Sequence, residues 1–174
     1  HMWTRRQRQM CIRDRTDGTP NGTVLVKTFP FSPTSEPDFY TKAGPLVYFV
    51  ADDFVHGREL WASDGTPAGT YLVKDLTVGG GSWPKNLAAV DDKVVFWASV
   101  PFVYETLFVS DGTDPGTFPL SPAGILNNVK PGNRDVYYHS GGDLWRTDGT
   151  AAGTIQVADL DSNIVCLLYT SDAA

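Results

Sequence analysis

The side chains of this sequence that could do chemistry are a few carboxylates and histidines between apolar segments. Asp52 and Asp53 lie close to His56, and Glu105 follows further along the chain. Two facing carboxylates could serve as the acid and the nucleophile or base of a glycosidase. His56 and His139 could bind a metal, but no third ligand stands at a zinc spacing. A glycosidase- or lactonase-like hydrolase is therefore the alternative hypothesis, and the sequence predicts no metal.

Other catalytic motifs are missing from the sequence. It contains no nucleophile elbow and no phosphate-binding loop, and outside the two ends it contains no Cys/His pair. The stretch from Asp159 to Asn163 imitates the start of a calcium loop but lacks the glycine and the glutamate that complete one. The sequence therefore predicts no catalytic residue and no cofactor, and it favours a protein that is not an enzyme.

Composition favours a folded chain built from strands. Of the 174 residues, 41% are hydrophobic and 12% aromatic, which is ordinary for a chain with a buried core. The 17 glycines and 12 prolines separate short apolar runs, so many tight turns and an all-β fold are expected. The net charge of −6 argues against nucleic acid as a partner. No apolar run approaches the roughly 20 residues of a membrane span.

One eight-residue pattern organises the chain. The pattern [Ser/Thr]-Asp-Gly-Thr-x-x-Gly-Thr occurs four times, with its aspartate at Asp17, Asp64, Asp111 and Asp148. Asp-Gly between two apolar runs is a strong hairpin signal, because glycine accepts a positive φ and aspartate bonds to nearby backbone amides. A residue that recurs once per unit seldom has a single active-site duty. We therefore interpret these aspartates as structural turn residues.

The intervals between copies are 47, 47 and 37 residues, close to the period of about 40 to 50 residues that is typical of propeller blades. The predicted fold is a segment of an all-β propeller, with three full blades of four antiparallel strands and partial blades at both ends. Full blades are expected at 37–78, 79–122 and 123–160. Residues 16–36 would form the last strand of an incomplete blade and a linker, and 161–174 would begin a further blade before running into a foreign tail.

Both ends of the chain look foreign to the repeat. Permitted codons for Cys166–Ala174, read on the complementary strand in a shifted frame, encode Gln7–Asp14. Such a match predicts that residues 1–15 and the tail are translated adapter DNA from an assembled, metagenomic-type fragment, with a cloning scar at the start. Cys11 and Cys166 both fall in these ends, so they carry no information on redox compartment.

The stretch Gly57-Arg58-Glu59-Leu60-Trp61-Ala62-Ser63-Asp64-Gly65-Thr66, followed by Val73-Lys74-Asp75-Leu76, resembles the bacterial proteins with ELWxxDGT repeats. The copy at Leu107–Leu120 is weaker, with Phe108 in place of tryptophan. This resemblance implies a β-propeller and a secreted or cell-surface location. It implies no settled activity and supplies no catalytic residues.

The leading hypothesis is a binding or structural module. Loops between the second and third strands and loops between blades lie on the same face of a propeller, where aromatic and polar side chains suit a carbohydrate or protein ligand. Because a ring needs at least four blades, several copies of the chain are expected to complete one together. The predicted ligand-binding residues on that face are Asp53, His56, Arg58, Trp83, Tyr104 and His139.

Overall fold

A computed structural model describes residues 12–15, 19, 21, 24–30, 37–101, 103–120, 126–131 and 135–159. All regular elements in these ranges are β-strands, so no helix there could cross a membrane. The strands are β1 (Ile12–Arg15), β2 (Val24–Thr28), β3 (Asp38–Ala43), β4 (Leu46–Asp52), β5 (Arg58–Ser63), β6 (Thr70–Leu72), β7 (Lys85–Val90), β8 (Lys93–Val100), β9 (Val103–Ser110), β10 (Phe118–Pro119), β11 (Leu126–Pro131), β12 (Val136–Ser140), β13 (Asp143–Thr147) and β14 (Ile155–Ala158).

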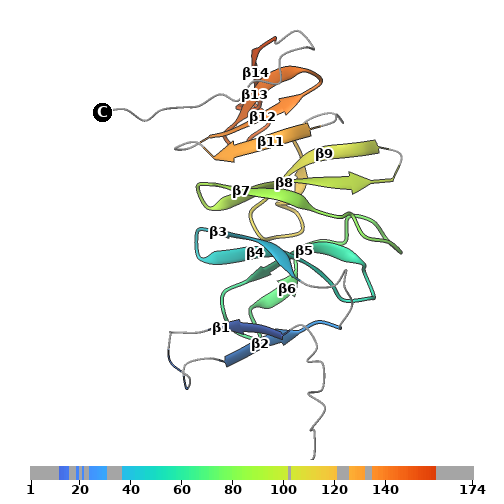
Figure 1. Ribbon diagram of the computed structural model, residues 1–174, viewed down its shortest axis with the longest axis vertical. Coiled ribbons are helices and arrows are strands. Elements are labelled where there is room, and N and C mark those ends of the chain that lie inside the picture. Colours follow the sequence, from blue (N-terminus) through green and yellow to red (C-terminus); the bar gives the residue numbers. More distant parts are fainter. Residues whose placement is uncertain are drawn as a thin grey trace, which may run out of the picture.

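Three sheets of four antiparallel strands form the body of the protein. The first sheet has the order β3-β4-β5-β6, the second contains β7 to β10, and the third contains β11 to β14. In each sheet, strands that follow one another along the chain are hydrogen-bonded neighbours. Figure 1 shows the sheets stacked one upon the next, with β1 and β2 at one end and the third sheet at the other. The prediction of an all-β chain of antiparallel sheets is confirmed.

A two-stranded sheet of β1 and β2 precedes the first full sheet. The sequence led us to expect only one strand here, with residues 1–15 outside the fold. Instead, Arg15 pairs with Val24 and Ile12 pairs with Thr28. Ladder hydrogen bonds are made by backbone groups, so the open edge of β2 can pair with whatever segment precedes it. Residues 12–15, which the sequence analysis assigned to a foreign extension, thus form a strand paired with β2.

Each sheet packs face to face on the next one. We call the face turned toward the next sheet along the chain the forward face, and the opposite one the backward face. On the forward face of the first sheet, Tyr48 and Leu60 pack against Phe96 and Phe108, which lie on the backward face of the second. Trp97, on the forward face of the second sheet, likewise packs against the third. Alternation of side chains along each strand produces the two faces.

An aromatic pair marks each backward face. The second sheet carries Phe96 and Phe108, whose ring centroids are 5.7 Å apart, and the third carries Tyr138 and Trp145 at 6.3 Å. In the first sheet Trp61 occupies this place, with its ring centroid 5.0 Å from that of Phe29, which follows β2. These large rings pack together with aliphatic side chains in the apolar clusters between the sheets.

The repeated pattern forms the same hydrogen-bonded turn at the end of each third strand. Between β5 and β6, Asp64 Oδ1 accepts bonds from the backbone N–H of Thr66 at 2.8 Å and from its hydroxyl at 2.7 Å. Thr66 Oγ1 accepts the N–H of Gly69, and the hydroxyl of Thr70 donates to the Thr66 carbonyl at 2.7 Å. Ser63 and Thr70 join their hydroxyls at 2.6 Å. Side-chain oxygens thus satisfy the backbone of a turn that makes few ladder bonds.

The turns after β9 and β13 repeat this network. Asp111 Oδ1 accepts both bonds from Thr113, and Asp148 Oδ1 accepts both from Thr150, at 2.6 to 2.9 Å. In each case the threonine hydroxyl bond lowers the pKa of the aspartate below its ordinary value. Asp17 lies outside the described residues.

Two glycines of the pattern are there for steric reasons. Gly65, directly after the aspartate, has a φ of +88°, in the left-handed region that glycine occupies without strain. A Cβ on Gly69 would lie 2.1 Å from Asp64 Oδ1. The same contact recurs between Gly116 and Asp111 at 2.0 Å. Only glycine therefore leaves room for the aspartate that organises the turn.

The turns also join neighbouring sheets. Lys74, just beyond β6 of the first sheet, donates from Nζ to the carbonyls of Asp114 and Thr117 at 3.2 Å, both in the turn of the second sheet. Its ammonium lies 2.8 Å from the Asp114 carboxylate. A Cβ on Gly112 would lie 2.7 Å from Leu46 of the first sheet. The repeated residues therefore build both the hairpin and the joint to its neighbour.

Candidate functional site

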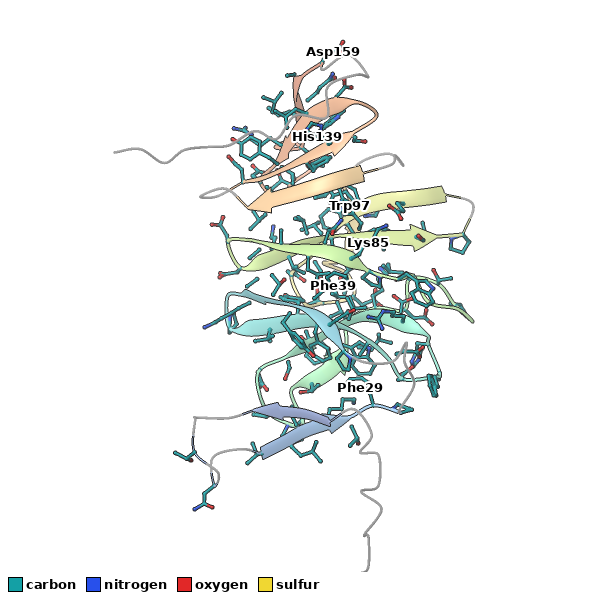
Figure 2. All side chains as sticks on the ribbon, in the orientation of Figure 1. Phe29, Phe39, Lys85, Trp97, His139 and Asp159 are labelled. Carbon is teal, nitrogen blue, oxygen red and sulfur yellow. The ribbon has the colours of Figure 1, made fainter. Side chains whose placement is uncertain are left out.

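The candidate site lies at the edge of the stack opposite these turns, where the first and second sheets meet. We call it the junction face: the β4–β5 loop (residues 53–57), the end of the link to β7 (residues 79–84) and the first residues of β3, β5 and β7. It is the edge that the sequence predicted to bind a ligand. Figure 2 labels Phe39 and Lys85, which belong to β3 and β7 at this junction.

The β4–β5 loop is shaped by two consecutive aspartates. Asp52 Oδ1 accepts the backbone N–H of Phe54 at 2.7 Å. Asp53 Oδ1 accepts the N–H groups of Val55 and His56 at 2.9 and 2.8 Å. These bonds form two overlapping Asx turns, which is why a five-residue loop of this composition holds one shape.

Asp53 also holds the ring of His56. Its Oδ2 lies 2.7 Å from His56 Nδ1. The hydrogen bond that the Asp53 carboxylate accepts from the imidazole raises the pKa of His56. Burial alone would raise the pKa of Asp53, but the bonds from the backbone and the ring of His56 together lower it. The pair is thus oriented like the aspartate and histidine of a hydrolytic triad, with Nε2 facing away from the carboxylate.

Close backbone contact fixes the β4–β5 loop against the link. Gly57 has a φ of +75°, and a Cβ there would lie 2.6 Å from the backbone nitrogen of Gly81. A Cβ on Gly81 would in turn lie 2.5 Å from the nitrogen of Arg58. The N–H of Trp83 donates to the Arg58 carbonyl at 3.0 Å. Loop and link therefore behave as one packed unit.

Arg58 connects three parts of the junction face. It is buried, and its Nη2 lies 2.5 Å from Asp38 Oδ2 at the start of β3. Its guanidinium carbon lies 6.0 Å from the centroid of the Trp83 ring, at the outer limit of a cation–π contact. Arg58 thereby orients the indole while its charge is balanced by Asp38.

Glu59 lies beneath this surface, fully buried. Its Oε1 accepts the N–H of Ser82 at 2.9 Å, and its Oε2 accepts the Ser82 hydroxyl in a short bond. Burial raises the pKa of Glu59 to about 7, more than these bonds lower it. Asp75 adds to the rise by repulsion. Glu59 is the anchor by which β5 holds the link that carries Trp83.

The surface above this anchor is apolar in its centre. Trp83 is 54% exposed, Phe54 57% and Val55 74%. Phe54 and Trp83 also hold positive φ angles of 63° and 52°, which costs a non-glycine residue about 1 to 3 kcal/mol. Exposed residues in a strained backbone conformation add little to the stability of the fold. Lys85 of β7 forms an ion pair with Glu105 of β9, two strands away in the second sheet.

Four of the six residues predicted to bind a ligand meet at the junction face, namely Asp53, His56, Arg58 and Trp83. Tyr104 lies in β9, next to Glu105, and its side chain is outside the described part of the chain. His139 was predicted in a loop matching that of His56, and this is wrong. It lies within β12, paired with Leu144, because the β12–β13 connection is only Gly141-Gly142. Figure 2 shows His139 in the third sheet, away from Lys85.

The sequence analysis missed Asp38, Glu59 and Ser82 as parts of the site. Glu59 is the first residue of the Glu-Leu-Trp triplet, and in the other two sheets Thr106 and Asp143 stand in its place. The available signal was a carboxylate directly before two buried apolar residues, Leu60 and Trp61. Within the described ranges, no three His, Cys, Asp or Glu side chains come together as a metal site.

Comparison with protein-family models gives no match to this chain. Comparison with curated proteins gives none either, so the assignment of a function rests on the junction face itself.

Proposed function

We propose that this chain is a non-enzymatic binding segment of a β-propeller from a secreted or surface protein of a bacterium. Its ligand, a carbohydrate or a protein segment, would bind at the junction face. The observation that carries this proposal is the pair of exposed aromatic residues, Phe54 and Trp83, held in strained backbone conformations above the buried Arg58 and Glu59. Strain kept at an exposed site is a mark of function.

The propeller arrangement is supported by how the sheets meet. Forward face packs on backward face at both contacts between full sheets. The first strands β3 and β7 contact one another directly, as do β7 and β11. First strands that lie side by side are what sheets around a common axis would have. The resemblance to ELWxxDGT-repeat proteins points to the same arrangement.

Engaged carboxylates favour binding over hydrolysis. Asp53 accepts three hydrogen bonds within its own loop, and Glu105 pairs with Lys85. Asp38 balances Arg58. A carboxylate that acts as nucleophile or base must face substrate, whereas these face neighbouring groups of the protein. An indole beside such groups instead provides a flat apolar surface for a sugar or an aliphatic side chain.

Trp83→Ala is expected to weaken ligand binding at least about tenfold, because exposed aromatic anchors dominate binding energy. The urea midpoint should stay near that of the wild type, since the ring is more than half exposed. A glycan array and a peptide array probed with both proteins measure the effect. His139→Ala is the matched control and should bind like the wild type. Equal retention by wild type and Trp83→Ala would contradict the proposal.

A second candidate function is hydrolysis, which the Asp53–His56 pair favours. His56 Nε2 could take a proton from water attacking a lactone or ester, while Asp53 holds the ring. Turnover of lactone or glycoside substrates by the wild type, abolished in Asp53→Asn, would establish this candidate and end the binding proposal. Ligand retention without turnover would exclude it.

A further inference from the structure

The two ends of the described stack carry the two halves of one repeated contact. Each contact between full sheets joins a forward face to a backward face. The forward faces of the first and second sheets are each covered by the next sheet, and the third sheet has an equivalent forward face. The backward face of the first sheet is covered by Phe29, which follows β2. The sheet of β1 and β2 has an equivalent backward face. Figure 1 shows these two sheets at opposite ends of the stack, so they do not meet within one chain.

The forward face of the third sheet is open at positions that are buried elsewhere. Strand pairing makes Tyr137 and Arg146 the equivalents of Tyr48 and Ala62, since each pair lies opposite across the second and third strands. Tyr48 and Ala62 are fully buried, whereas Tyr137 is half-buried and the Arg146 side chain is 38% exposed. At these two positions the forward face of the third sheet is therefore more exposed than that of the first sheet, although Leu144 on the same face is buried.

Residues in or directly after the fourth strand of each sheet show the same difference in exposure. Val73 follows β6, packs against the second sheet and is 4% exposed. Leu120, in the same place after β10, packs in the cluster between the second and third sheets. Val157 of β14 is their equivalent and is 50% exposed. An apolar residue at a position that packs in both other sheets indicates a face built for the same contact.

The backward face of β2 is open as well. Leu25 of β2 is the equivalent of Leu72 in β6, counted from the aspartate of each repeat. Leu72 packs against the cluster of Phe29, Phe49 and Trp61. Leu25 is 50% exposed, although its neighbour Val26 on the other face is buried.

We infer that the forward face of the third sheet binds the backward face of β2 in a second copy of this chain. Val157 of one copy and Leu25 of the other take the places that Val73 and Leu72 have at the contacts inside the chain. Such a head-to-tail contact uses a different surface on each partner and closes a ring when the rotation between copies permits. His139 and Arg146 make this contact more polar than those inside the chain, as is common between subunits.

Light scattering of the full chain over a range of concentrations tests the contact. The wild type is expected to associate, and Val157→Asp and Leu25→Asp are each expected to be monomeric. Val78→Asp, at a 90% exposed position in the link, is the control and should associate like the wild type. Because both test positions are half exposed, the variants should fold, which circular dichroism checks.

A mixture of the two variants gives the decisive result. Val157→Asp keeps an intact backward face on β2, and Leu25→Asp keeps an intact third sheet. Their equimolar mixture should therefore form a dimer of one copy of each, and nothing larger. A monomeric wild type, variants that associate normally, or a mixture that stays monomeric would each overturn the inference.

This inference rests on the proposed propeller arrangement and not on the proposed ligand. Val157→Asp should retain ligand, since Val157 lies on the third sheet, away from the junction face. A wild type that stays monomeric but binds ligand through Trp83 would remove the docking contact and leave the proposed function intact.

Discussion

Glu59→Gln is expected to remove most of the pH dependence of stability between pH 4.5 and 7. The pKa of Glu59 is raised by burial to about 7 in the folded protein, from an ordinary value of 4.5. As the pH rises through this window, the unfolded chain releases the proton and the folded protein keeps it. The contribution of Glu59 to the free energy of unfolding therefore falls with rising pH, by about 3 kcal/mol in all, and is constant above about 7.

Urea denaturation at pH 4.5 and at pH 8 measures this effect. Glutamine can still accept the Ser82 N–H and can donate to the Ser82 hydroxyl, so the variant should differ less in stability between the two pH values than the wild type, with the remaining fall due to His56. His56 and Asp75 lie near Glu59 and remain in the variant. Glu105→Gln is the matched control and should keep the wild-type slope. A slope unchanged by Glu59→Gln would show that another group carries it.

Gly57→Ala is expected to lower the free energy of unfolding by about 2 to 5 kcal/mol. Alanine at a φ of +75° costs about 1 to 2 kcal/mol, and its Cβ would lie 2.6 Å from the nitrogen of Gly81. Relief of that overlap requires the loop and the link to move apart, at a further cost of about 1 to 3 kcal/mol. Because the link carries Trp83, ligand binding should weaken together with stability.

Gly80→Ala is the control for this substitution. Gly80 lies in the same link, and a Cβ there would meet only the Thr77 methyl group at an ordinary 3.6 Å. Its change in the urea midpoint should be small. If Gly57→Ala were as stable as Gly80→Ala, the close packing of loop on link would be wrong.

The sequence predicted the sheets well because one local signal recurs. Asp-Gly followed by two threonines favours one structure, a turn closed by side-chain oxygens. The positions of this pattern therefore predicted where each third strand ends. The fourth strand of the first sheet is short and ends at Leu72. Beyond it the chain leaves the ladder, and Lys74 bonds to the turn of the second sheet.

The junction face was predicted only in part, because its contacts join residues distant in sequence. Asp53 and His56 bond within one loop, so their spacing could suggest the pair. The bonds of Glu59 to Ser82 and of Arg58 to Asp38 depend on how loop, link and first strand fold together. The position of His139 was predicted wrongly for a related reason. Whether His139 lies in a loop depends on the length of the β12–β13 connection, and not on the similarity of this repeat to the first one.

The repeated residues build turns and joints, whereas the residues of the junction face are the ones proposed to bind a ligand. The most direct test is the urea midpoint of Asp64→Ala, Asp111→Ala and Asp148→Ala, with ligand retention measured on the same samples. Each variant loses two hydrogen bonds to a threonine, so each should lose about 1 to 3 kcal/mol and still retain ligand while folded. Unchanged midpoints with ligand retention lost would contradict the account.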